Sequence, residues 1–187
     1  MKYFTPERLV RFCSPDDDRA DHAGEEWEQA ADRYRRHYRT IAPALPATLR
    51  KFHDELCLHD ADVFAPAKVA KPTLPKADHE VVIVTQNINT LVPEFVNTLI
   101  FLHYGVTEEP SIVPHTVSSA LHQVQPRWLY DEIDLVEPGL FAHEMLLSTG
   151  RVITLRFRAF RGTVAPLVGR IQDTGVKGRA KGKAASA

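Results

Sequence analysis

The segment from Trp128 to Phe160 constrains the fold more than any other part of the chain. Apolar and polar residues alternate along it in three runs, separated by Pro138-Gly139 and by Ser148-Thr149-Gly150. A period of two is typical of strands with one buried face, and Gly-containing breaks are typical of tight turns. The segment therefore predicts three antiparallel strands in succession.

The turn at Gly150 allows two registers, which place opposite side chains in the core. A two-residue loop pairs Leu147 with Val152, whereas a three-residue loop pairs Leu147 with Arg151. Only the three-residue loop brings apolar side chains of the two strands to one face, namely Phe141, Met145, Leu147, Ile153, Leu155 and Phe157. We therefore predict this register, with Gly150 in the left-handed region.

This register also places two polar residues of the first strand of the hairpin. His143 falls on the apolar face, where we expect a core histidine bonded to a backbone carbonyl or a tyrosine. Glu144 falls on the opposite face, close to Thr154 and Arg156. Such cross-strand charge pairs contribute only tenths of a kcal/mol, so the apolar match decides the register.

The N-terminal third of the chain has the signals of helices. Thr5-Pro6-Glu7 combines a cap, a first-turn proline and an acid, and predicts a short helix that ends near Cys13. A second start follows at Ser14–Asp18, and Pro46 begins a third, short helix. Steps of three and four residues mark the buried stripe of the long second helix, through Ala23, Trp27, Ala30, Tyr34, Tyr38 and Ile41.

The remainder of the chain favours strands and turns. The period becomes two from Leu56 to Phe64, and further strands are expected at Glu80–Thr85, Thr98–Tyr104 and Thr116–Val124, with loops at Lys71–Lys76 and Gly105–Pro110. Helices followed by strands indicate an α+β fold, with the helices on one face of a meandering antiparallel sheet of about seven strands. We expect one domain over residues 1–171, of which 1–55 form the helical layer and 56–171 the sheet, and a disordered basic tail at 172–187.

Composition excludes several classes of protein. The net charge is −1, so no global field favours nucleic acid or membrane. No apolar run is long enough for a membrane helix, and the first residues do not resemble a signal peptide. Two cysteines are too few for a disulfide scaffold, which predicts a cytoplasmic protein.

Four fragments together resemble an uncharacterised bacterial family, a domain of unknown function. They are Met1–Thr5, Leu58-His59-Asp60-Ala61, Trp128–Glu132 and Phe141–Gly150. The resemblance implies an α+β bacterial protein and no established activity. Small sheet proteins of this kind are similar to immunity proteins of bacterial toxin systems.

His59, Asp60 and Asp62 come closest to a metal-binding motif. Imidazole and carboxylate are ligands for zinc, manganese or iron, so a metal-dependent hydrolase is the alternative function. In a strand, however, Asp60 and Asp62 share one face and His59 points to the other. We therefore expect no metal site and no cofactor.

Other constellations also favour binding over catalysis. His143-Glu144 lacks the second histidine of a zincin, and the acidic residues Asp131, Glu132, Asp134, Glu137 and Glu144 are typical of a solvated sheet face neutralised by Arg156 and Arg158. Arg33–Arg39 interleaves basic and aromatic residues, as nucleic-acid-binding segments do, but Tyr34 and Tyr38 fall on the buried stripe. We expect no specific nucleic acid and no membrane as partner.

The sequence thus predicts a non-enzymatic, immunity-like module that binds another protein. Its expected binding residues lie on the open face of the sheet and have mixed charge: Glu132, Asp134, Glu144, Arg156 and Arg158. Complementary charges suit reversible association between proteins. The sequence does not indicate an oligomeric state.

Overall fold

Three helices and eight strands form the described part of the chain, which comprises residues 1–75, 77–87, 98–115 and 125–167 of the computed structural model. The helices are α1 (Pro6–Phe12), α2 (Asp17–Ile41) and α3 (Ala47–Glu55). The strands are β1 (Asp62–Val63), β2 (Ala67–Lys68), β3 (His79–Asn87), β4 (Thr98–Val106), β5 (Ser111–Pro114), β6 (Trp128–Glu137), β7 (Leu140–Leu147) and β8 (Arg151–Pro166). The predicted α+β class is confirmed.

The starts of α1 and α2 and the buried stripe of α2 lie where the sequence predicts them. The Thr5 and Asp16 side chains accept hydrogen bonds from the Arg8 and Arg19 backbone amides, as N-caps do. Trp27 and Tyr34 of α2 are buried, and they pack with Phe4 and with the outer side of β7. The helices were therefore predictable from capping and periodicity.

All strand pairs are antiparallel, in the order β1-β3-β4-β8-β7-β6. The sheet departs from a simple meander at β8, which pairs with β7 along one edge and with both β4 and β5 along the other. At 16 residues, β8 is long enough to accommodate the two shorter strands end to end. β2 and β5 were not predicted from the sequence.

The β7–β8 hairpin has the predicted register. Met145 pairs with Ile153 and Glu144 with Thr154, and Gly150 has a φ of 76°. The Gly150 amide donates to the Leu147 carbonyl, which closes the three-residue loop. His143 is buried on the core face, as expected.

The sheet curls until its two outer strands meet at one end. Asp62 of β1 bridges to Arg127, just before β6. The Asp60 amide donates to the Trp128 carbonyl, and the Trp128 amide donates to the Ala61 carbonyl. The core fills the inner side of this curled sheet.

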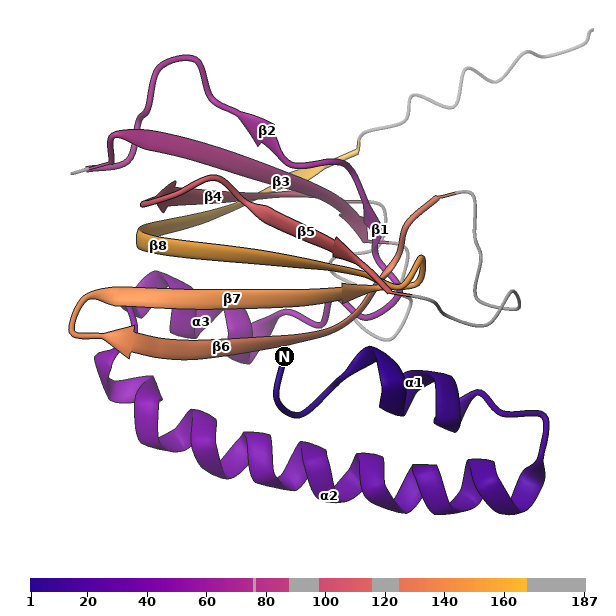
Figure 1. Cartoon of the computed structure of the whole chain (residues 1–187). Helices are drawn as coiled ribbons and strands as arrows, with labels where there is room; N and C mark the ends of the chain where they lie inside the picture. Colours follow the sequence, from indigo (N-terminus) through magenta and orange to yellow (C-terminus); the bar gives the residue numbers. More distant parts are fainter. Residues whose placement is uncertain (76, 88–97, 116–124, 168–187) are drawn as a thin grey trace, which may run out of the picture.

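Two of the helices pack against strands of the sheet, α3 against β8 and α2 against β6. Phe52 of α3 packs over Gly162 of β8, where a methyl group would meet its ring at 2.9 Å. Figure 1 shows α2 running along β6, the last strand of the sheet. There the Ile133 backbone amide donates to the Tyr34 hydroxyl at 2.7 Å.

The strand predicted at Leu56–Phe64 is wrong for most of its length. Only Asp62 and Val63 are in a strand, and Asp60 has a φ of 67°. A residue in the left-handed region breaks the alternation of an extended chain, and Asp adopts this region more readily than most residues. The predicted strand Thr116–Val124 and the predicted tail at 172–187 lie outside the described residues. Within the described ranges, no helix has the length and apolar character needed to cross a membrane.

Candidate functional site

A chain of hydrogen bonds links three strands on the inner face of the sheet. The Tyr104 hydroxyl of β4 lies 2.9 Å from Nδ1 of His143 on β7. Nε2 of His143 lies 3.0 Å from Oδ2 of Asp131 on β6, and Oδ1 of Asp131 accepts from the Trp128 indole at 3.0 Å. Tyr104 and His143 are buried, so Asp131 is the end of this chain that remains accessible.

Burial and hydrogen bonding fix the protons of this network. Burial raises the pKa of the Tyr104 hydroxyl well above its usual range. Burial also raises the pKa of the Asp131 carboxyl, but the hydrogen bonds from His143 and Trp128 and the electrostatic effect of His143 and His53 together outweigh it, and the net pKa is lowered. Tyr104 therefore keeps its proton, and Asp131 stays ionised and accepts a hydrogen bond from His143.

Asp131 borders a cavity of about 430 Å³ between β6, α3 and the segment after α3. The Asp131 side chain is 26% exposed, against 2% for His143. The walls are mainly aromatic and aliphatic, and include Phe4, Tyr34, Phe52, Leu58, Trp128, Tyr130 and Ile133. The cavity thus combines mainly apolar walls with the ionised carboxylate of Asp131 on β6, and Asp54 and Glu55 of α3 add two further carboxylates to its lining.

His53 and Asp54 of α3 form the polar rim. The His53 ring stacks on Tyr38 with ring centres 4.2 Å apart, and the Tyr38 hydroxyl donates to Asp54 at 3.1 Å. The electrostatic effect of His53 also contributes to the lowered pKa of Asp131. These contacts hold the rim of the cavity against α2.

The contacts of His143 leave no free ring nitrogen that could act as a general base. A general base has to reach the proton it removes. Both ring nitrogens of His143 are already engaged with Tyr104 and Asp131. A carboxylate has about four acceptor positions, so Asp131 can still accept from a ligand beside Trp128 and His143.

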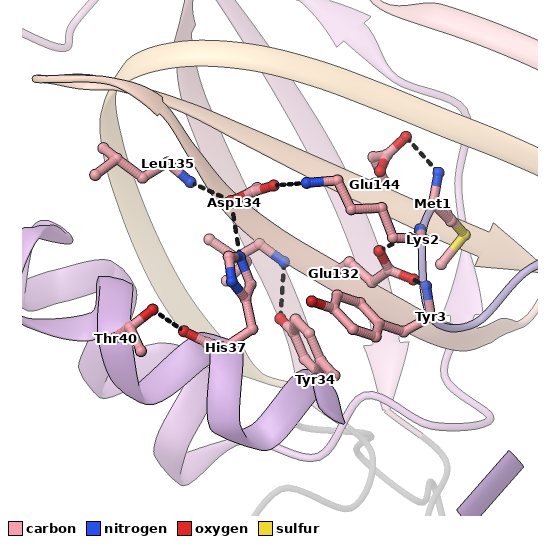
Figure 2. Close-up of polar contacts among 11 residues, drawn as sticks. Met1, Lys2, Tyr3, Tyr34, His37, Thr40, Glu132, Asp134, Leu135 and Glu144 are labelled. Atoms are coloured by element: carbon pink, nitrogen blue, oxygen red, sulfur yellow. Dashed lines mark hydrogen bonds and ion pairs between the residues drawn. The ribbon is translucent and has the colours of Figure 1, made fainter. Parts of the chain in front are cut away.

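The predicted binding residues lie elsewhere, on the outer face of β6, β7 and β8. Figure 2 shows Met1, Lys2 and Tyr3 of the N-terminal segment beside Glu132, Asp134 and Glu144 of this face. Glu132 is only 4% exposed and accepts the backbone amides of Lys2, Tyr3 and Phe4 at 2.7–2.8 Å. The Met1 amino group lies 2.7 Å from Glu144. Part of the face expected to be open is therefore covered by the chain itself.

The remaining charges of this face are paired within the molecule. Asp134 lies 2.7 Å from Lys2 and 2.9 Å from His37 (Figure 2). Arg158 pairs with Glu137 at 2.9 Å, which agrees with the predicted neutralisation. Arg156 pairs with Glu108 at 3.4 Å. Asp131, which was grouped with these acids, lies on the inner face instead.

His59, Asp60 and Asp62, the residues of the alternative metal site, are not arranged as the sequence pattern predicts. His59 and Asp60 were expected on opposite faces of a strand, but Nδ1 of His59 lies 3.0 Å from Oδ2 of Asp60. That expectation is wrong because Asp60 leaves the extended conformation. Asp62 faces Arg127 at 3.5 Å, and the described ranges contain no group of three or more potential metal ligands.

Sequence reasoning missed the Asp131 cavity. One signal was available, because alternation along β6 puts Asp131 on the same side as Ile133 and Leu135. An acid on an apolar face requires a buried partner, and the predicted core position of His143 on the adjacent strand supplies one. Tyr104 and His53 come from distant segments, whose approach no local pattern indicates.

Comparisons with protein-family models, with curated proteins and with solved structures found no match to this chain. The resemblance to an uncharacterised bacterial family therefore stays a prediction.

Proposed function

We propose that this protein is a non-enzymatic binding protein whose small-molecule ligand occupies the Asp131 cavity. The observation that supports this most is an ionised carboxylate at the edge of an aromatic-walled cavity. The ligand class that fits is an amine or another cationic N–H donor on a flat apolar body. The charge of the ligand meets Asp131, and its body lies against the rings.

Size and chemistry agree with this ligand class. A cavity of about 430 Å³ lies in the range of small-molecule sites. Trp128 and Tyr130 present aromatic rings, which attract cations as well as apolar surface. A charge-assisted hydrogen bond to Asp131 would fix the orientation of the ligand.

Calorimetric titration with three matched compounds tests the proposal. Phenethylamine, 2-phenylethanol and phenylacetate share one ring and differ in charge. We expect the amine to bind and the acid not to bind at neutral pH. The alcohol should bind at least about tenfold more weakly than the amine, since hydrogen bonds to charged groups contribute about 1.5–3 kcal/mol. Quenching or enhancement of Trp128 fluorescence gives a second readout.

The matched variants are Asp131→Asn and Asp134→Asn, on opposite faces of the same strand. Asparagine keeps the shape of the side chain and removes its charge. We expect Asp131→Asn to abolish the preference for the amine and Asp134→Asn to retain it. Equal binding of all three compounds, or equal effects of the two variants, would contradict the proposal.

A second candidate function is the protein-binding role expected from the sequence. Arg156 and Arg158 are about half exposed, at 51% and 48%, and their acidic partners are exposed to a similar degree. Exposed pairs contribute little stability and exchange partners readily, which supports reversible binding of a protein with complementary charge. A purified partner should lose affinity for the Arg156→Glu/Arg158→Glu variant and keep it for Arg36→Glu. We also propose a cytoplasmic location, which the free thiols of Cys13 and Cys57 support.

A further inference from the structure

A second cavity, of about 420 Å³, lies between the C-terminal half of α2 and α3. Arg35 and Arg39 line it from α2, and Arg50 lines it from α3. Its other polar lining residues are Tyr34, Tyr38, His53 and Asp54. We name this cavity the arginine groove.

The groove has an excess of positive charge. Arg35 is paired with Asp32 at 2.6 Å, and Asp54 accepts from the Tyr38 hydroxyl at 3.1 Å. Neither Arg39 nor Arg50 forms an ion pair with a carboxylate in the described part of the chain. The polar contact of Arg50 is a 3.5 Å hydrogen bond to the Ala42 carbonyl.

The helix dipole accounts for the position of only one of these two arginines. Arg39 lies in the last turn of α2, where the helix dipole favours a cation. Arg50 is the fourth residue of α3, close to the positive end of that helix, where a cation is disfavoured. No side chain caps this end, because Pro46 occupies the cap position. Two guanidinium groups, always charged, thus line one groove beside a positive helix end.

We infer that the arginine groove binds a phosphate group of a small molecule, between Arg39 and Arg50. The Asp54 carboxylate offsets part of the charge of Arg39 and Arg50, so the groove keeps a net positive charge. A phosphate suits this groove because its several oxygens accept the paired N–H groups of both guanidinium groups, whereas the two oxygens of a single carboxylate pair with one guanidinium at a time. This site goes beyond the proposed function and does not use Asp131, although Tyr34, His53 and Asp54 line both cavities.

Titration of the full chain with inorganic phosphate and with phenyl phosphate tests the inference, at pH 7.5 and at an ionic strength held constant with sodium chloride. The variants are Arg39→Gln and Arg50→Gln, and the matched control is Arg36→Gln, an exposed arginine of α2 that does not line the groove. All three are surface substitutions, so the fold should persist. We expect each groove variant to weaken phenyl phosphate binding by about tenfold or more, as a lost charge-assisted hydrogen bond does, and the control to change it less than twofold.

The two phosphates distinguish the source of the group. Tighter binding of phenyl phosphate supports the site with an organic phosphate monoester as ligand, and equal binding supports it with free phosphate. Absence of binding by either phosphate beyond that of chloride would overturn the inference. An equal loss in Arg36→Gln, or binding of a short RNA that all three variants weaken alike, would overturn it too, because α2 would then attract anions along its whole cationic face.

Discussion

Gly150 holds the single conformation on which the β7–β8 register depends. Its φ of 76° is in the left-handed region, which costs a non-glycine residue about 1–2 kcal/mol. The cost depends on the side chain: β-branched residues tolerate this region worst, and asparagine visits it more readily. The loop therefore discriminates among substitutions at one position.

We predict that Gly150→Val destabilises the protein most, Gly150→Asn clearly less, and Thr149→Ala hardly at all. The Thr149 hydroxyl is buried and has no hydrogen-bond partner within the described residues, so its removal loses no bond. Urea denaturation midpoints at constant slope measure the order. Equal effects of valine and asparagine would contradict a positive φ at Gly150.

Glu80 is a buried carboxylate on the outer face of β3. It accepts hydrogen bonds from the backbone amides of Thr73 and Leu74 and contacts His103 at 2.6 Å. Burial raises the pKa of the Glu80 carboxyl, but these hydrogen bonds outweigh it and bring the pKa to about 2, from a usual value of 4.5. The ionised form thus holds the segment at Thr73 and Leu74 against the sheet.

This lowered pKa predicts the acid sensitivity of the fold. A pKa lower in the folded than in the unfolded state stabilises the protein above pH 4.5, and this contribution is lost as the pH falls toward 2. The difference corresponds to about 3 kcal/mol. In unfolding experiments from pH 7 to pH 2, the wild type should lose that much more stability than Glu80→Gln. Parallel pH profiles would show that Glu80 is not held in its ionised form.

At the scale of secondary-structure elements, two glycines test how α2 and α3 pack. A methyl group at Gly162 would lie 2.9 Å from the Phe52 ring of α3. At Gly24, within α2, the nearest atom would be 3.7 Å away, which is ordinary contact. The same substitution therefore meets a tight interface in β8 and only ordinary van der Waals contact in the helix.

We predict that Gly162→Ala destabilises the protein by about 1–3 kcal/mol, as overpacking does. Gly24→Ala should stabilise it by about 0.5–1 kcal/mol, since alanine is the better helix former. Phe52→Leu should relieve part of the Gly162→Ala penalty, and a double-mutant cycle measures this coupling. If the effects of Gly162→Ala and Phe52→Leu on the free energy of unfolding were additive, Phe52 of α3 would not contact residue 162.

The elements that the sequence predicts well are those whose signals are local. The caps at Thr5 and Asp16 and the turn at Gly150 lie within a few residues of the structures they determine. The strand predicted at Leu56–Phe64 is wrong because the local alternation does not determine the backbone conformation there. That conformation depends on the distant Trp128, whose carbonyl accepts a hydrogen bond from the Asp60 amide.

The candidate site shows the same limit more strongly. His143 was predicted in the core with tyrosine as one possible partner, and the partner is Tyr104, which lies 39 residues away along the chain. The cavity needs α3, β6 and the segment after α3 together, and these approach one another only once the sheet has curled. The burial of Glu132 under residues 2–4 spans more than 125 residues, which no pattern in either segment indicates.

At the scale of the whole molecule, the meeting of β1 with the residues before β6 joins the two ends of the sheet. β1 has only two residues, and so short a strand is ordinarily labile. Here it is held on both sides, by β3 and by the backbone of Pro126–Trp128. The junction should therefore open only together with the sheet.

Native-state hydrogen exchange measures this cooperativity. We predict that the amides of Asp60, Val63 and Trp128 exchange nearly as slowly as those of β4, because each donates across the junction. Arg127→Ala removes the ion pair with Asp62 and should raise the exchange rates of these amides and of β4 by the same factor, because the junction and the sheet open together. Rates close to those of the exposed Glu108–Glu109 turn would mean that the junction opens by itself.

The hydroxyl of Tyr34 occupies the place that a neighbouring strand would take on β6. An uncovered edge strand is where sheets of separate molecules join, and a chain so rich in strands is open to that hazard. Helix α2 therefore covers the core and also prevents another strand from pairing with β6. Stress that detaches α2 while β6–β8 stay paired would expose the Ile133 amide to other copies of the chain, so self-association should begin before global unfolding.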